Sequence, residues 1–239
     1  MLAGGIVFWL VKNGLPMLNV EFLMESSSIL KEQIGLREYL GNTVMLLLTT
    51  LFLGGGVGII TAVYLCEYVE KEKVKRAIYL AIEVLAGIPS IVFGLFGMVF
   101  FGEIMGLGYS LLCGAFTLTI MILPIVIANT QEALNMVPKE YRTGALALGA
   151  GKWQMIQTIL LPGAVAGIGA GLTLSAGKIL GETAALLFTA GSKGSLAVAI
   201  YMLIGKGMVK EAAGTALVLM GGILLLKLLQ QYIKEYQQR

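Results

Sequence analysis

This chain of 239 residues is 57% hydrophobic and only 13% charged, and its formal net charge is +3. Soluble domains carry about 25% charged residues, so the composition excludes a water-soluble fold and predicts an all-α bundle of membrane helices. The chain contains no histidine and no aspartate, which excludes catalytic and metal sites built on histidine. We therefore expect no metal in this chain and no nucleic-acid partner.

The first apolar segment is too short to cross a membrane. Residues 2–11 are apolar and cover about 15 Å at 1.5 Å per residue, which is half a span. We expect them to be the outer half of a first helix whose beginning is missing. A signal peptide is the rival interpretation, but no basic residue precedes the apolar run. Residues 1–38 are assigned to this partial helix and an external segment.

Five later segments are long enough to cross, since a helix needs about 20 apolar residues to do so. They cover residues 39–66, 84–102, 104–131, 163–190 and 212–226. Residues 77–82 can extend the second, and Lys227 can snorkel at the end of the last. The transmembrane domain is thus expected over residues 39–230, with a cytoplasmic tail at 231–239. Residues 195–205 are apolar but too short, and predict a re-entrant or interfacial segment.

Basic residues in the short connections indicate the orientation. The connection after the first full span, the polar segment after the third and the C-terminal tail must share one side of the membrane. Together they hold ten basic residues, against six in the connections on the opposite side. This excess places the polar segment of residues 143–162 in the cytoplasm.

That polar segment predicts a helix, a glycine turn and a second short helix. Strong helix formers lead up to Gly149-Ala150-Gly151, where glycine permits a positive φ. Trp153, Ile156 and Ile159 then recur with Leu160 at helical spacing, and Pro162 is expected just before or within the first turn of the next span. Such a unit can seat in a groove of a partner protein. An ordinary loop on the membrane surface is the alternative.

The segment resembles the EAA coupling loop of ABC importer permeases. That pattern is Glu-Ala-Ala, three residues, Gly, nine residues, Ile, one residue and Leu-Pro. Its spacing is matched from Thr143 to Pro162, and the coupling loop is expected over residues 131–162. Thr143 and Gly144 depart from the first Glu and the first Ala of the pattern. The residues that the resemblance assigns to ATPase contact are Thr143, Gly144, Ala145, Gly149, Ala150, Lys152, Ile159, Leu161 and Pro162.

Two further blocks resemble phosphate importer permeases of the PstA type, namely residues 85–97 (LAGIPSIVFGLFG) and 180–191 (LGETAALLFTAG). The resemblance covers most of the chain and implies a type I ABC importer permease core of five full spans plus a partial N-terminal span. It also implies a PstC-type permease as heterodimer partner, an ATPase dimer that binds ATP and magnesium, an external phosphate-binding protein, and the cell membrane of a prokaryote. No cofactor is expected in this chain.

Two charges interrupt the fourth span. Each costs about 2.5–3.5 kcal/mol on insertion scales, and Lys178 and Glu182 stand at i and i+4, where they can pair along one helix face. The stripe of Gly163, Gly167 and Gly171 predicts close approach of another helix beside them. Lys178 is expected to attract phosphate while Glu182 orients or gates it. The alternative is a buried ion pair that only fixes packing.

A second candidate position in the substrate pathway lies around residue 89. Pro89 should kink or break its helix, and Ser90 can satisfy the backbone groups that are freed. Broken helices often line transport sites, and Glu83 stands a turn or two before the break. A packing kink, with Glu83 paired to Lys75 or Arg76, is the alternative.

The chain has no P-loop, because Trp153 follows Gly151-Lys152 where serine or threonine is needed. Alone it is therefore expected not to be an enzyme, and energy must come from another chain. The sequence thus predicts the permease subunit of an ATP-driven phosphate importer that works by alternating access. A permease for another oxyanion (sulfate, molybdate or phosphonate) and, more remotely, an ion-coupled carrier or a membrane scaffold or sensor stay open.

Overall fold

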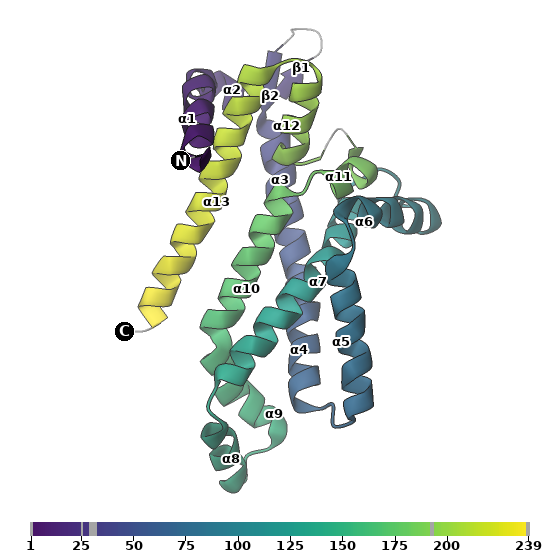
Figure 1. Ribbon diagram of the computed structural model, residues 1–239, viewed down its shortest axis with the longest axis vertical. Coiled ribbons are helices and arrows are strands. Elements are labelled where there is room, and N and C mark those ends of the chain that lie inside the picture. The colour runs from purple at the N-terminus through teal and green to yellow at the C-terminus, as the bar shows by residue number, and fades with distance from the viewer. Residues whose placement is uncertain (1, 25, 29–32, 192–193, 238–239) are drawn as a thin grey trace.

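The computed structural model describes residues 2–24, 26–28, 33–191 and 194–237. Most of the helices run along one long axis, and a small two-stranded sheet lies at one end (Figure 1). The α-helices are α1 (Leu2–Gly14), α2 (Val20–Met24), α3 (Arg37–Thr50), α4 (Gly56–Glu67), α5 (Glu72–Gly87), α6 (Ser90–Gly97), α7 (Leu111–Met136), α8 (Lys139–Ala147), α9 (Lys152–Met155), α10 (Leu161–Gly181), α11 (Ala184–Thr189), α12 (Leu196–Gly205) and α13 (Val209–Gln237).

Short irregular segments join these helices. They are the 3-10 turn η1 (Leu15–Met17), the π-helical segments η3 (Leu51–Gly55), η4 (Met98–Ile104) and η5 (Ile156–Leu160), and the antiparallel strands β1 (Ser26–Ser28) and β2 (Gln33–Leu36). Because η3 and η5 are themselves helical, α3 continues into α4 and α9 continues into α10 without a break.

Four helices in the described part of the chain are long and apolar enough to cross a membrane. They are Arg37–Glu67, Leu111–Met136, Lys152–Gly181 and Val209–Tyr232. A fifth is reached if α5 and the helix Ser90–Ile104 are one span, although these two are bent by 99°. The predicted all-α membrane bundle is confirmed.

The second and third predicted spans are placed wrongly. The connection after α4 is only residues 68–71, and α5 already begins at Glu72, because Glu, Lys and Arg are good helix formers even where they are too polar for lipid. The break at Pro89 then turns α6 sharply away from α5, so residues 84–102 are not one straight span. Gly106 and Gly108, at φ +73° and +57°, turn the chain before α7 begins at Leu111.

The last predicted span is longer than expected. α13 continues to Gln237, through most of the segment expected to be a separate tail. α12 has ten residues and is too short to cross, as predicted, and it packs beside α13 and α3.

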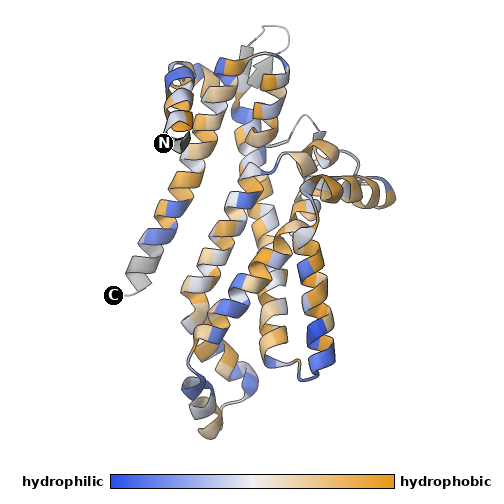
Figure 2. Cartoon of the chain, viewed as in Figure 1, coloured by the Kyte–Doolittle hydropathy of each residue, from blue (hydrophilic) through white to orange (hydrophobic). Residues whose placement is uncertain are grey.

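The core is built around α7. Leu118, Ile122 and Val126 of α7 are buried against Leu46 of α3 and Leu186 of α11. α7 reaches the opposite end of the bundle from α12, where it meets α8 and the ends of α4 and α9. Hydrophilic residues gather at that end on α5, α8 and α9, while the middle of each long helix is mainly apolar (Figure 2).

Glycines let α10 lie close to α7. A Cβ on Gly167 would meet the Cβ of Ala133 at 2.5 Å, and one on Gly171 would meet that of Asn129 at 2.6 Å. Gly163 faces Val137 in the same way, at 3.1 Å. The predicted glycine stripe is therefore confirmed, and its partner is α7.

Candidate functional site

The polar segment folds into α8, a glycine turn and α9, which we call the α8–α9 unit (residues 139–155). α8 ends in a Schellman motif, in which the Gly149 N–H donates to the Leu146 carbonyl at 3.0 Å and the Ala150 N–H donates to the Ala145 carbonyl at 3.1 Å. Gly149 has φ +84°, the left-handed conformation that this cap requires. The predicted glycine break is confirmed at this residue.

The second helix of the unit is not separate from the next span, and this part of the prediction is wrong. α9, η5 and α10 form one helix from Lys152 to Gly181. Pro162 lies in the first turn of α10, directly after η5. A proline ring clashes with the carbonyl four residues before it, and a π-bulge relieves such a clash by re-spacing the turn. Any movement of α9 is consequently a movement of α10.

The underside of the α8–α9 unit is an apolar cluster. Ala145, Met155 and Ile156 are buried there, together with Leu134 of α7 and Val63 of α4. Ala150, Ile159 and Leu161 are partly buried against the same cluster. The unit is thus packed on the ends of two membrane helices and is not a loose loop.

The outer face of the unit is also partly apolar. Leu148 is 90% exposed, and Tyr141, Leu146 and Trp153 are at least half exposed. The helical repeat predicts that Trp153 shares a face with Ile156, but Trp153 points outward while Ile156 is fully buried. Thr143 and Gly144, the two departures from the coupling pattern, lie on α8 without being buried. An exposed apolar surface of this kind marks a contact with either another protein or the membrane.

Arg142 connects α8 to both neighbouring helices. Its Nη1 donates to Glu67 Oε1 at the end of α4, in an ion pair, and its Nη2 donates to the Leu134 carbonyl of α7 at 2.7 Å. The Glu67 side chain is only 8% exposed. Buried charges need such partners. In the sequence, Arg142 stands out only as a basic residue of a connection, and Glu67 does not stand out at all.

A second contact joins the other half of the unit to the same helix end. The Lys152 ammonium lies 5.0 Å from the centroid of the Tyr68 ring, within the range of a cation–π interaction. Tyr68 directly follows Glu67 in the chain. Each of the two helices of the α8–α9 unit therefore holds one of two adjacent residues at the end of α4.

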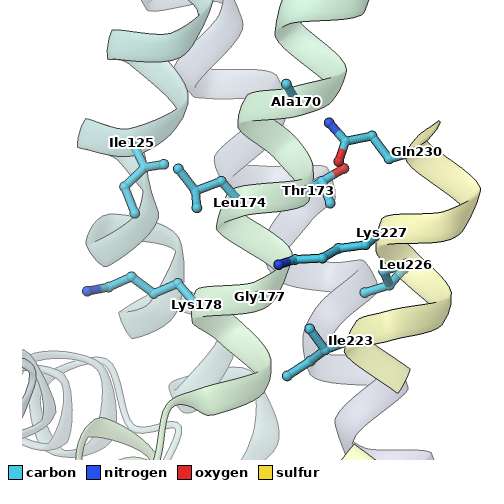
Figure 3. A pocket seen from close by; sticks show the side chains of 10 residues that line it. All are labelled: Ile125, Ala170, Thr173, Leu174, Gly177, Lys178, Ile223, Leu226, Lys227 and Gln230. Carbon is cyan, nitrogen blue, oxygen red and sulfur yellow. The ribbon is translucent and has the colours of Figure 1, made fainter. Parts of the chain in front are cut away.

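Lys178 lies on α10 in a cavity of about 660 Å³ between α10, α13 and α7 (Figure 3). Lys227 and Gln230 of α13 point toward α10, and Thr173 stands opposite them. The rest of the lining is mainly aliphatic. The lining includes two lysines and no carboxylate from the described residues, so its charge is positive. The Lys227 side chain points toward α10, whereas the Lys178 side chain points away from α13 (Figure 3). Lys227 was expected only to snorkel, and its place beside this cavity is new.

Glu182 does not pair with Lys178, and the expected i, i+4 contact is wrong. α10 ends at Gly181, and Glu182 is extended, at φ −79° and ψ 122°. Its Oε1 accepts from the Ala185 N–H at 3.2 Å and caps the start of α11 instead. The residue is buried. Because the helix ends one residue earlier, the two charged side chains no longer share a helix face.

The break at Pro89 is confirmed, but it does not join the Lys178 cavity. Pro89 and Ser90 lie between α5 and α6, and neither lines that cavity. Among the described residues, Glu83 forms no ion pair with Lys75 or Arg76 on α5. The Ser90 hydroxyl forms no hydrogen bond with another described residue. Within the same part of the chain, no group of three potential metal ligands is close enough to hold an ion.

The family model "Binding-protein-dependent transport system inner membrane component" matches residues 54–236, which include the α8–α9 unit and the Lys178 cavity. The chain belongs to this family. As a member of it, and with its four or five apolar helices, the chain is a multi-pass membrane protein.

Curated members of the family are similar over most of this chain. It is 37% identical over 187 residues to the "Probable ABC transporter permease protein YqgI" of Bacillus subtilis, covering 78% of this chain and 64% of that protein. It is 38% identical over 187 residues to the "Phosphate transport system permease protein PstA" of Pasteurella multocida, covering 77% and 66%. The chain thus spans slightly less than two thirds of the length of these relatives.

Solved structures share the fold of this family member. The MetNI methionine ABC transporter in an inward-facing conformation superposes with a TM-score of 0.70 at 20% identity, covering 84% of this chain and 94% of that chain. A bacterial alginate ABC transporter superposes with a TM-score of 0.68 at 18% identity, covering 98% and 92%. At such low identity these matches show the fold of an ABC importer permease and nothing finer.

Proposed function

We propose that this chain is a permease subunit of an ATP-driven importer that carries inorganic phosphate inward. The observation that carries the proposal is its 38% identity to a PstA phosphate permease over 77% of the chain. A second PstA, from Xylella fastidiosa, is 36% identical over 76% of the chain. The substrate is inferred for this chain from those relatives, and the partners from its resemblance to ABC importer permeases.

The α8–α9 unit is the proposed contact with the ATPase. Its exposed apolar residues, Leu148 above all, offer a docking surface, and Gly149 holds the turn in a fixed shape. The residues assigned to this contact by the coupling pattern are Thr143, Gly144, Ala145, Gly149, Ala150, Lys152, Ile159, Leu161 and Pro162. Ala145, Ile159 and Leu161 are not part of the exposed surface; they pack the unit against the apolar cluster that includes Leu134 of α7 and Val63 of α4.

The continuous helix Lys152–Gly181 is the proposed lever. Lys178 stands 26 residues beyond Lys152, about 39 Å along the helix at 1.5 Å per residue. When the ATPase closes, a push on α9 reaches Lys178 through one rigid element. Alternating access would follow as the lever tilts against a PstC-type partner subunit.

Lys178 is the proposed attraction for the anion. An ammonium is a point charge and lacks the two-pronged grip of a guanidinium on phosphate, so its role is to lower the barrier for a doubly charged ion rather than to bind it tightly. Glu182, Glu83, Pro89 and Ser90 remain proposed parts of the pathway, with Glu182 fixing the start of α11 beside it.

The remaining parts of the importer lie in other chains. We propose an ATPase dimer that binds ATP and magnesium, an external phosphate-binding protein and the inner membrane of a prokaryote. The chain itself is proposed to hydrolyse nothing, since its sequence carries no P-loop.

Reconstitution of the whole assembly in proteoliposomes tests the proposal. With the binding protein present, phosphate should stimulate ATP hydrolysis and enter the vesicles, whereas sulfate at the same concentration should do neither. Stimulation by sulfate and not by phosphate would assign another oxyanion. Uptake driven by an ion gradient without nucleotide would reject the ATP-driven mechanism altogether.

A further inference from the structure

The ion pair between Arg142 and Glu67 connects the α8–α9 unit to a part of the molecule that the lever does not reach. Glu67 is the last residue of α4, and α5 begins at Glu72 after a four-residue connection. α4 and α5 also share an apolar cluster with α7, in which Leu65 of α4 and Ile127 of α7 are buried beside Ile78 of α5. A force applied at Glu67 therefore acts on the α4–α5 hairpin as a whole.

The guanidinium of Arg142 is fixed on both sides. One terminal nitrogen pairs with the Glu67 carboxylate, and the other donates to the Leu134 carbonyl near the end of α7 at 2.7 Å. The side chains are 21% and 8% exposed, so water screens their attraction much less than it does for a surface pair. A planar guanidinium with two acceptors has little freedom to rotate.

Lys152 supports the same connection from the other side of the turn. Its ammonium lies over the ring of Tyr68, the residue after Glu67. The two helices of the unit thus contact consecutive residues at the end of α4: α8 through an ion pair with Glu67, and α9 through a cation–π contact with Tyr68. This double attachment joins the unit to the end of α4, where the short connection to α5 begins.

We propose that Arg142 and Glu67 are positioning residues that transmit movement of the α8–α9 unit to the α4–α5 hairpin. This inference rests on the proposed function, in which an ATPase moves the unit. Movement would then divide between two routes: the continuous helix into α10, and the Arg142–Glu67 pair into α4 and α5. Packed elements and salt-bridge networks with fixed geometry are the physical carriers of such coupling.

Substitution in the reconstituted assembly tests the transmission. Glu67→Gln and Arg142→Gln remove one charge each while keeping a polar side chain. Each should lower the amount of substrate transported per ATP hydrolysed, by about fivefold or more if this contact carries a typical coupling energy. The double variant should be no worse than the more severe single variant, because both remove the same interaction.

Glu70→Gln is the matched control. Glu70 is an exposed carboxylate three residues further along the chain and forms no ion pair with a described residue, so its loss should leave transport per ATP unchanged. Co-purification of the ATPase and the melting temperature are measured for every variant. A pair that only stabilises the fold would lower assembly or melting temperature and leave transport per ATP unchanged, which would overturn the inference.

A distance measurement on the full chain in nanodiscs, without substrate or ATPase, tests whether the Arg142–Glu67 pair holds α8 in a fixed position relative to α5. Spin labels at Lys73 on α5 and Lys139 on α8, both exposed, are placed in a background with Cys66→Ala and Cys113→Ser. The labels should give one narrow distance distribution in the parent and in Glu70→Gln, and a broad one in Glu67→Gln. Equal distributions in all three would overturn the inference, even if the importer proved to carry another substrate or none.

Discussion

At the scale of single residues, Gly149 is the position where backbone conformation alone determines the effect of a substitution. Its φ is +84°, and a Cβ added there would meet no atom within 4 Å. A substitution is therefore strained by the left-handed backbone and not by a clash. Gly151, two residues on, has φ −66° and is equally open, which makes it a matched control.

Gly149→Ala should weaken the Schellman motif by about 1–2 kcal/mol, the cost of a left-handed conformation for an L-residue. We expect less transport per ATP hydrolysed, and a larger loss for Gly149→Val because a β-branched residue resists positive φ more strongly. Gly151→Ala should match the parent. The account of the turn would be wrong if the two alanine variants behaved alike.

At Lys178, the charge of the side chain is expected to determine the effect of a substitution on phosphate uptake. At an effective dielectric constant of about 20, a unit charge about 8 Å away contributes about 2 kcal/mol. Lys178→Glu turns this attraction into repulsion and should lower phosphate uptake by at least about tenfold.

The series at this position separates charge from packing. Lys178→Arg should retain most of the uptake, and Lys178→Gln should be intermediate. The measurement is initial uptake in proteoliposomes with equal amounts of inserted protein. Normal uptake by Lys178→Glu would remove this residue from the pathway.

The sequence reveals some of these residues and hides others for definite reasons. Gly149 is recognisable because a turn between helix formers needs a left-handed residue. The Arg142–Glu67 pair is not, since the partners are 75 positions apart and no local pattern relates them. The expected pairing of Glu182 with Lys178 fails because α10 ends at Gly181, one residue before Glu182. The expected shared face of Trp153 and Ile156 fails because a helical repeat alone does not say which of its members face the core.

At the scale of elements, the contact between α10 and α7 holds the lever in place. Gly167 and Gly171 bring the two helices together, whereas a Cβ added to Gly169 would meet nothing within 4 Å. The three glycines thus differ in packing although they share one helix. The i, i+4, i+8 spacing of Gly163, Gly167 and Gly171 predicts the stripe correctly, and Gly169 lies outside it.

Gly167→Leu should push α10 off α7 and cost about 1–3 kcal/mol, the usual penalty for overpacking. The melting temperature of the purified chain in detergent should fall, while Gly169→Ala should leave it unchanged. An equal melting temperature for both variants would contradict the close approach of these helices.

The element boundaries show where sequence periodicity is insufficient. α5 begins among charged residues, and α6 turns away from it by 99°. The second predicted span, which was based on hydrophobicity alone, therefore runs across the break between these two helices. Conversely, α9 joins α10 through η5, where Pro162 suggested a boundary. Pro89 ends α5 although hydrophobicity continues past it, whereas η5 carries the helix past Pro162.

At the scale of the whole molecule, the two ends of the bundle differ in composition and therefore in expected environment. The connection between α4 and α5 and the α8–α9 unit lie at one end, and the turn between α12 and α13 lies at the other (Figure 1). The proposed mechanism needs the first end in the cytoplasm. The excess of basic residues there favours that orientation.

Single cysteines test the orientation. In a background without Cys66 and Cys113, Lys206→Cys in the turn between α12 and α13 should react with a membrane-impermeant maleimide on intact cells. Leu148→Cys should react only after permeabilisation. Both residues are exposed in the structure, so the opposite pattern would mean an inverted topology.

The most direct measurement of the central idea is cross-linking from the tip of the α8–α9 unit in an actively transporting assembly. A photoreactive side chain at Ala150 or Lys152 should capture the ATPase subunit, and the yield should change when ATP is bound. If an active preparation yields no adduct with an ATPase from either position, this unit does not receive the driving movement, and the account is wrong.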